Sequence, residues 1–379
     1  MSYISKRLSH FDSNDFRNAI KKQSLITDPV DLSIGIPEEL TAEHVKAAGI
    51  KAIKENKTTY LPANGLLDLR LAIAKKLDNE NNINCNAENI TIVPGLTTGL
   101  LLVYLALLDQ GDEVIVLDPY YPPYPHLASM VGAHVIYVST YPSFHPDLSL
   151  IEASITSRTK MLVINSPNNP TGAVYDEITL RKIAQLAERH NLLILADEIY
   201  EHFTFDKKHF SLGSIYPNTV TMNGFSKQYA MTGWRLGYIE GPLDIIDAIN
   251  NLQQYIVMSS SSIAQYAGLS AINHPPKIST KYHDKRNYLV NELRKSGVQI
   301  QGAEGAFYLY IKTPGNMTDI EFTEKASSKG LIILPGRAFS QRNDFVRISY
   351  GSEMNDIKRG VKILHAIVNE PKNSNHVRV

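Results

Sequence analysis

The chain has 379 residues, of which 43% are hydrophobic and 20% charged, as in ordinary soluble globular proteins. Lysine plus arginine and aspartate plus glutamate both number 38, so the net charge indicates neither a nucleic-acid partner nor a membrane surface. Cys85 is the only cysteine, which excludes an intramolecular disulfide and suits a reducing compartment. With no apolar leader at the start and no apolar run long enough to span a bilayer, we expect a cytoplasmic protein.

Short apolar runs alternate with helical patterns through the middle of the chain. The runs are Ile90–Val93, Val114–Leu117, Val135–Val138, Met161–Ile164, Leu192–Ala196 and Val220–Met222. Most are continuously apolar, as expected for strands that are buried on both faces. Between them, Thr179–His190 carries Leu180, Ile183, Ala184 and Ala187 on one helical face. This alternation predicts an α/β fold, a mostly parallel sheet that is sandwiched by helices.

The pattern changes after about residue 280, where a second region begins. A charged helical segment, Tyr282–Lys295, precedes strand-like pieces at Ala306–Ile311 and Phe345–Ser349 and a last helix near Asp356–Val368. The length of the chain also suits one large domain with a smaller companion. We therefore predict an N-terminal segment (1–39) that packs with the small domain, a large domain (40–283) and a smaller α+β domain (284–379).

Polar residues follow several predicted strands, at the edge where open α/β sheets bind their ligands. Ile90–Val93 leads into the glycine turn Pro94–Gly99 and an apolar helix. Such a turn could offer free N–H groups to a phosphate, or it could be an ordinary strand–helix connection. The tyrosine-rich stretch Asp118–Tyr124 could stack on a flat heterocycle, or it could be a packed surface loop.

Three later strand ends carry amides, a carboxylate and an amine. Met161–Ile164 runs into the rigid turn Asn165–Gly172, which is rich in asparagine and proline. Asp197 follows five apolar residues, so its carboxylate should lie near the interior and require a cationic partner. Val220–Met222 leads to Lys227. A lone lysine is usually a solvated surface charge, but this one shares its rim of the sheet with the other groups.

This run of motifs closely resembles the class I aminotransferases of the fold type I pyridoxal 5′-phosphate (PLP) enzymes. The matching motifs, in chain order, are Asn165–Gly172, Ala196–Tyr200, Ser226–Gly237, Gly305–Tyr308, Pro335–Phe339 and Val346–Tyr350. Their order and spacing make the resemblance far more specific than any single motif. It implies a PLP-dependent aminotransferase that moves an amino group between an L-amino acid of the aspartate, aromatic or alanine type and a 2-oxo acid.

The resemblance also implies a role for each matching residue around the cofactor ring. Lys227 would carry PLP covalently and shuttle the proton of the substrate. Asp197 would pair with the pyridine nitrogen, and Tyr121 would stack on the ring. Tyr200 and Asn169 would hydrogen-bond the phenolate oxygen of the cofactor.

Other matching residues would hold the phosphate and the substrate. The phosphate would be bound by Gly95, Leu96, Thr97, Ser226 and Arg235. Arg347, with Asn169 and the backbone of Gly35, would hold the α-carboxylate of the substrate in a bidentate pair. Tyr60 resembles the tyrosine that reaches the phosphate of the neighbouring subunit, which implies a homodimer with shared active sites. No metal site is expected.

Two other functions share these motifs. One is a PLP-dependent β-lyase or cyclising synthase, which has the same scaffold and cofactor but a different substrate pocket. The other is the PLP-sensing half of a transcription regulator, which would need an N-terminal DNA-binding module where family-like sequence already begins. Thr97 stands where aspartate-type relatives often carry lysine, which argues against a strictly dicarboxylic substrate. Candidates for the side-chain pocket are Ile36, Thr98, Tyr255, Ser259 and Arg337.

Overall fold

The computed structural model describes residues 3–5, 7, 27–275 and 280–370. Its main sheet has seven strands in the order β2-β8-β7-β6-β5-β3-β4. They are β2 (Ile90–Val93), β3 (Glu113–Asp118), β4 (His134–Ser139), β5 (Thr159–Asn165), β6 (Leu193–Asp197), β7 (Thr219–Gly224) and β8 (Gly237–Glu240). All neighbours pair in parallel except β8, which is antiparallel to both β2 and β7.

Each of the six predicted runs is confirmed as a strand of this sheet, and so is the α/β fold. Strand β8 was not predicted, because it begins with Gly237 and ends with Glu240 and so shows no continuous apolar run. Strand β4 also differs from the expectation of burial on both faces. It forms one edge of the sheet, where His134, Tyr137 and Ser139 are exposed.

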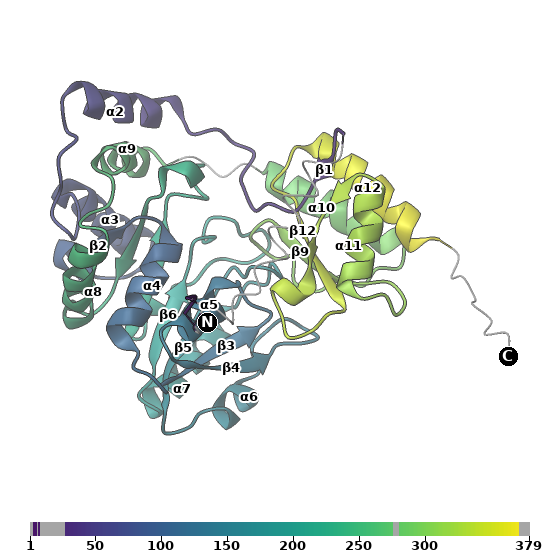
Figure 1. Cartoon of the computed structure of the whole chain (residues 1–379), viewed down its shortest axis with the longest axis horizontal. Coiled ribbons are helices and arrows are strands. Elements are labelled where there is room, and N and C mark those ends of the chain that lie inside the picture. The colour runs from purple at the N-terminus through teal and green to yellow at the C-terminus, as the bar shows by residue number, and fades with distance from the viewer. Residues whose placement is uncertain (1–2, 6, 8–26, 276–279, 371–379) are drawn as a thin grey trace.

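Helices cover both faces of the main sheet (Figure 1). Successive side chains of a strand point to opposite faces, and those of β3 accordingly enter two different cores. Ile115 and Leu117 pack with residues of α6 (Leu148–Ala153) and α7 (Glu177–Arg189). Val114 and Val116 pack with α4 (Leu96–Leu107), α5 (Pro123–Met130) and α8 (Leu243–Ile256). The predicted sandwich is therefore present.

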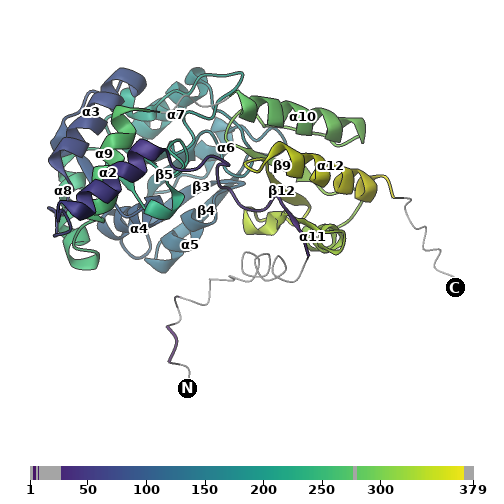
Figure 2. The same ribbon diagram turned by 90° about the horizontal axis from the view of Figure 1, so that it is seen from above.

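Three further helices complete the region around the main sheet. Helix α2 (Glu43–Lys54) lies beside α9 (Ser262–Asn273), as Figure 2 shows from above. Helices α3 (Leu67–Asn81) and α9 share a core with β2 and β8. Several helices begin at side-chain caps. For example, Asp176 accepts a hydrogen bond from the N–H of Thr179 at the start of α7.

A smaller three-stranded sheet, in the order β11-β12-β9, lies with α10 (Lys281–Lys295), α11 (Asp319–Ser328) and α12 (Met354–Val368) at one end of the molecule (Figure 1). Its strands are β9 (Tyr308–Lys312), β11 (Leu334–Pro335) and β12 (Phe345–Ser349), and all neighbours are antiparallel. The short strand β1 (Val30–Asp31) pairs in parallel with β10 (Leu331–Ile332).

Val30 and Leu32 share a hydrophobic core with residues of β9, β12, α10 and α12. Val45, which follows the predicted boundary at 39/40, belongs instead to the core that α3 and α9 share with β2 and β8. The domain boundaries themselves stay a prediction, and most of the predicted N-terminal segment lies outside the described residues. Within the part of the chain that the structure describes, no helix is long and apolar enough to cross a membrane.

Candidate active site

A cavity of about 280 Å³ lies at the carboxyl ends of the main-sheet strands. Eleven of the residues predicted to bind the cofactor or the α-carboxylate line it: Gly35, Leu96, Thr97, Tyr121, Asn169, Asp197, Tyr200, Ser226, Lys227, Arg235 and Arg347. Asp197 is the last residue of β6, and Asn169 and Lys227 follow β5 and β7. Arg347 comes from β12 of the smaller sheet. Residues far apart in the chain therefore converge on one cavity.

The carboxylate of Asp197 lies in the interior, where the residue is 5% exposed. It accepts hydrogen bonds from the hydroxyl of Tyr124 at 2.7 Å and from the N–H of Ile199 at 3.2 Å. Burial raises the pKa of Asp197 to about 6, although these hydrogen bonds and the charge of Lys227 oppose the rise. A buried carboxylate of this kind is stabilised by a cationic N–H group placed beside it.

The amine of Lys227 donates a hydrogen bond to the carbonyl oxygen of Gly35 at 2.6 Å. Burial lowers the pKa of this amine to about 8, and the positive charges of Arg347 and Arg235 add to the effect. A lysine whose pKa approaches neutrality has more of its neutral, nucleophilic form at working pH. The geometry thus suits an amine that attacks a carbonyl carbon.

The guanidinium of Arg347 is buried without a carboxylate partner among the described residues. Its Nη1 donates to Oδ1 of Asn169 at 3.0 Å, and its Nη2 donates to the carbonyl of Ser33 at 2.6 Å. It lies 4.5 Å from the ring centroids of Tyr308 and Phe339, and its Nε has no hydrogen-bond partner in the described structure. A guanidinium that lines a cavity and lacks a carboxylate partner is a suitable partner for a carboxylate ligand.

The other end of the cavity is suited to a phosphate. Helix α4 begins there at Leu96. The preceding residue, Gly95, has a φ of +82°, which favours glycine, and it provides no side-chain cap for the first N–H groups. The guanidinium of Arg235 lies against Gly95, so that a β-carbon on Gly95 would overlap its Nη2 atom. Leu96, Thr97 and Ser226 line the same cavity. Backbone N–H groups, hydroxyls and a guanidinium are the usual phosphate donors.

Two tyrosines of the site were not assigned a role from the sequence. Tyr124 hydrogen-bonds Asp197, and Tyr308 lies 2.8 Å from the hydroxyl of Tyr200, oxygen to oxygen. Both belong to motifs that were recognised, the tyrosine-rich stretch and Gly305–Tyr308, which was the available signal. Asn165 was also missed as a supporting residue, although its Oδ1 accepts the N–H of Asn169 at 2.8 Å.

Some predicted residues lie outside the cavity. Gly95 does not line it but contacts Arg235, which does. Tyr60 is 79% exposed on the surface of the chain. Of the side-chain pocket candidates only Ile36 lines the cavity. The guanidinium of Arg337 instead donates hydrogen bonds to the buried carboxylate of Asp319, the shortest at 2.6 Å. The remaining candidates, Thr98, Tyr255 and Ser259, do not line it.

These groups fit pyridoxal phosphate, the cofactor expected from the sequence. The buried carboxylate of Asp197 can pair with a protonated ring nitrogen, and the amine of Lys227 can bind an aldehyde carbon. The start of α4 and Arg235 can hold the phosphate. Arg347 lines the same cavity without a carboxylate partner among the described residues, which leaves one further position for a second, carboxylate-bearing ligand.

Comparisons with known proteins agree with this chemistry. Residues 27–364 match the family model for aminotransferase class I and II. A probable aspartate/prephenate aminotransferase of Thermus aquaticus is 37% identical over 88% of this chain and 90% of its own. An aromatic-amino-acid aminotransferase of Thermococcus litoralis is 31% identical over 97% of this chain and 99% of its own. The solved aspartate aminotransferase of Thermus thermophilus with maleate has a TM-score of 0.91 and 34% identity over 97% of this chain and 100% of that one.

The contact between Gly95 and Arg235 generates the first prediction. Gly95→Ala should weaken binding of pyridoxal phosphate by at least about tenfold, because the added methyl group displaces the guanidinium and the backbone conformation disfavours alanine. Gly233→Ala is the matched control, since its β-carbon would meet no atom within 4 Å. Titration of both variants with the cofactor checks the expectation, and equal affinities would contradict it.

Proposed function

The chain belongs to the class I and II aminotransferases and is a PLP-dependent aminotransferase, and on that premise we propose which residues do the work and which substrates they accept. The observation that supports the proposal is the convergence of Asp197, Lys227 and Arg347 on one cavity of about 280 Å³. Bound PLP supplies an electron-withdrawing ring that stabilises negative charge on the α-carbon of an amino acid.

In this proposal, Asp197 keeps the ring nitrogen protonated and Lys227 carries the cofactor. Once the substrate has displaced Lys227 from the cofactor, the free amine of Lys227 accepts and returns the α-proton as the general base. Its lowered pKa suits this role, since a base works best when its pKa is near the working pH. Tyr200 and Asn169 orient the oxygen of the ring, and Tyr121 stacks on its face.

Arg347 binds the α-carboxylate of every substrate, with Asn169 and the backbone of Gly35 beside it. The cavity lining contains two further cations, Lys227 and Arg235, and both have other roles in this proposal. Arg337 is held by Asp319. No further cation of this chain lines the described cavity for a distal carboxylate, while Ile36 and Ile199 offer apolar contacts. We therefore infer a substrate range that is broader than dicarboxylic amino acids.

We further propose a homodimer in which Tyr60 reaches the phosphate of the neighbouring subunit. Tyr60 is 79% exposed, so its side chain is accessible to a neighbouring subunit. Other exposed apolar side chains occur on the N-terminal third of the chain and near α8: Leu40, Ile50, Ile53, Leu67, Leu71, Tyr255, Ile256 and Met258. A cytoplasmic location, suggested by the single cysteine, is part of the same proposal.

The proposed function is tested by a panel of amino acids with 2-oxoglutarate as acceptor. We expect an amino donor alone to bleach the visible absorption of the PLP-loaded protein, and the 2-oxo acid to restore it. Aromatic and aliphatic donors should react within about a hundredfold of aspartate and glutamate, a difference of roughly 2.7 kcal/mol. A larger preference for dicarboxylic donors would contradict the inferred range. Release of ammonia and pyruvate without an acceptor would favour a β-lyase.

Arg347→Ala should weaken all substrates by a similar factor, because the α-carboxylate is common to them. Losing this charged pair should lower kcat/KM by a factor that corresponds to about 2–5 kcal/mol. Arg337→Ala is the control, since that guanidinium is bound to Asp319 and lies outside the cavity lining. If Arg347→Ala impaired only one class of donor, Arg347 would be recognising the side chain instead.

Shared sites predict complementation between two damaged proteins. Lys227→Ala and a Tyr60 variant chosen for severe loss of cofactor binding should each be nearly inactive as homodimers. After subunit exchange, each hybrid dimer has one site with both defects and one site with neither. About half of the dimers should be hybrids, so activity should reach roughly a quarter of that of the wild type.

Exchange must be verified with differently tagged chains, because failure to exchange would look like failure to complement. Verified hybrids without recovered activity would contradict the shared site. They would leave the cofactor and the role of Lys227 unaffected, since neither depends on Tyr60.

A further inference from the structure

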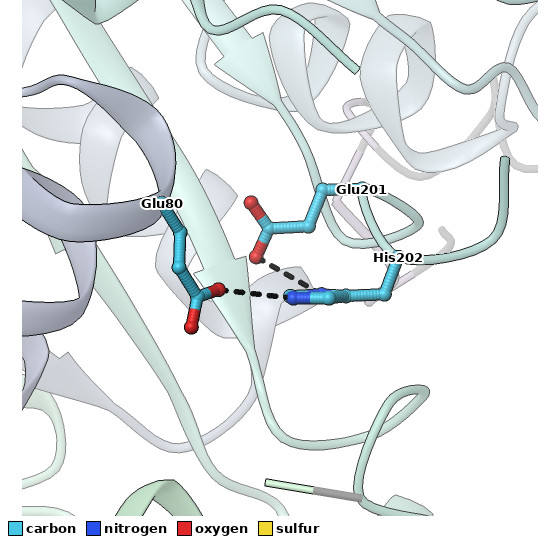
Figure 3. Close-up of side chains that lie close together, drawn as sticks. All are labelled: Glu80, Glu201 and His202. Atoms are coloured by element: carbon cyan, nitrogen blue, oxygen red, sulfur yellow. Dashed lines mark hydrogen bonds and ion pairs between the residues drawn. The ribbon is translucent and has the colours of Figure 1, made fainter. Parts of the chain in front are cut away.

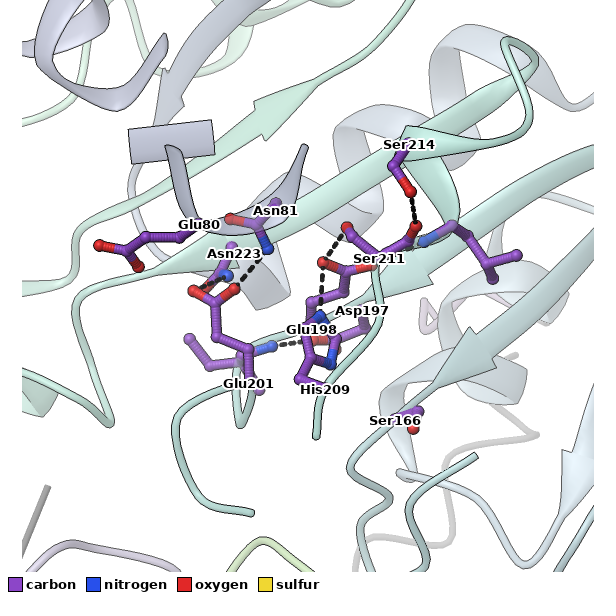
Figure 4. A network of polar contacts seen from close by, with 12 residues as sticks. Glu80, Asn81, Ser166, Asp197, Glu198, Glu201, His209, Ser211, Ser214 and Asn223 are labelled. Atoms are coloured by element: carbon purple, nitrogen blue, oxygen red, sulfur yellow. Dashed lines mark hydrogen bonds and ion pairs between the residues drawn. The ribbon is translucent and has the colours of Figure 1, made fainter. Parts of the chain in front are cut away.

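A buried polar cluster lies behind the active site, on the side of the strand ends away from the cavity. Its centre is Glu201, which comes four residues after Asp197 and directly after Tyr200 and does not line the cavity. One oxygen of its carboxylate pairs with the ammonium of Lys76 and accepts Nδ2 of Asn223 at 2.7 Å. The other accepts Nδ2 of Asn81 at 2.7 Å. Figure 4 shows these amides converging on Glu201 from two directions.

The two amides come from different elements. Asn81 is the last residue of α3, whereas Asn223 lies near the end of β7, four residues before Lys227. The Oδ1 atom of Asn223 also accepts the N–H of Gly224 at 2.7 Å. The side chain of Asn223 is therefore fixed at both ends, and its bond to Glu201 joins the turn after β6 to the end of β7.

We propose that Glu201 and Asn223 are positioning residues, whose hydrogen bond holds the turn carrying Asp197 and Tyr200 against the segment carrying Lys227. The bond thereby sets how far the amine of Lys227 reaches into the cavity. This inference rests on the role proposed above for Lys227. It adds two residues that touch neither the cofactor nor the substrate.

The same cluster contains acid–imidazole groupings that resemble metal sites. The Nε2 of His202 lies 3.0 Å from Glu80, and its Nδ1 lies 3.4 Å from Glu201 (Figure 3). His209 and Ser211 similarly hydrogen-bond Glu198 (Figure 4). The ammonium of Lys76 already contacts Glu201, however, so the cluster contains its own cation. We interpret it as an ion-paired support for the strand ends.

The charge of Glu201 is constant at working pH. Burial raises the pKa of this carboxyl, but the charges of Lys76, His202 and His209 and the hydrogen bond from Asn81 outweigh it and bring the pKa to about 2. The carboxylate is thus a permanent acceptor for Asn223. Burial is also the main cause of the low pKa of Lys227, with Arg347 and Arg235 adding to it and Asp197 opposing it. Loosening the segment should admit water and raise that pKa toward its ordinary value.

The chain offers a matched pair of variants for the test. Asn223 and Asn81 are 3% and 4% exposed, and each donates one hydrogen bond of 2.7 Å to Glu201. Each also accepts one further bond, from the N–H of Gly224 and from Lys76 respectively. Asn223→Leu and Asn81→Leu should therefore lower stability toward urea to a similar extent. Only Asn223→Leu frees the segment that leads to Lys227.

The readout is the pH midpoint of Lys227, measured in the apoprotein from the rate of its acetylation by acetic anhydride. We expect Asn223→Leu to raise the midpoint by at least about 0.5 pH unit and Asn81→Leu to leave it unchanged. The pH midpoint of the visible absorption of the PLP-loaded enzyme should shift only in Asn223→Leu. An unchanged midpoint in Asn223→Leu, or an equal shift in Asn81→Leu, would overturn the proposal.

Asn223→Ser keeps the test decisive if Asn223→Leu does not fold. Its hydroxyl can still accept the N–H of Gly224, but it is too short to reach Glu201, so the same upward shift is expected. Failure of the proposed function gives a different result, because a wild-type protein that neither binds PLP nor transaminates would reject the role of Lys227. The acetylation of the apoprotein would still report whether the Glu201–Asn223 bond controls burial of the amine.

Discussion

The burial of the Asp197 carboxylate at the end of β6 is the constraint on which the rest of the site depends. Removing a carboxylate from water is costly, and here two hydrogen bonds from Tyr124 and Ile199 offset only part of that cost. Its position is fixed because β6 is a central strand, with Asp197 opposite Asn165 on β5 and Met222 on β7. The sheet thus holds the carboxylate of Asp197 in a fixed position, where it can accept a hydrogen bond from a cationic group.

The surrounding charges are arranged so that the cavity keeps its unsatisfied groups. Arg347 lies between two aromatic rings and donates to neutral oxygens, which stabilise it without cancelling its charge. Behind the strands, by contrast, Glu201 and Lys76 neutralise each other. Arg347 inside the cavity thus keeps a charge that no carboxylate of the described residues neutralises, and such a group has free energy to gain from a ligand.

Much of the main sheet and most of the cavity could be predicted from the sequence, because both have local signals. A run such as Ile90–Val93 shows its burial directly, and polar residues such as Asp197 and Lys227 are informative because they follow such runs. Contacts between distant residues have no local signal. Nothing near Glu201 in the chain indicates that its partner is Lys76, on α3, and nothing near Arg347 indicates the carbonyl of Ser33. The resemblance to the family predicted the role of Arg347, but it did not predict which residues hold the site residues in position.

The cavity also requires that the main sheet and the smaller sheet keep a fixed position relative to each other. The groups proposed to bind the cofactor follow strands of the main sheet, whereas Arg347 lies on the smaller sheet, so their spacing depends on the contact between the two sheets. The N–H of Tyr120 donates to the carbonyl of Phe339 at 2.8 Å, and Tyr141 lies 2.9 Å from the hydroxyl of Ser340. Phe345, on β12, packs in the same hydrophobic core as residues of β3 and α7. The element that carries Arg347 is thus anchored directly on the sheet that carries Asp197, and this contact lets the proposed carboxylate site at Arg347 face the proposed cofactor groups.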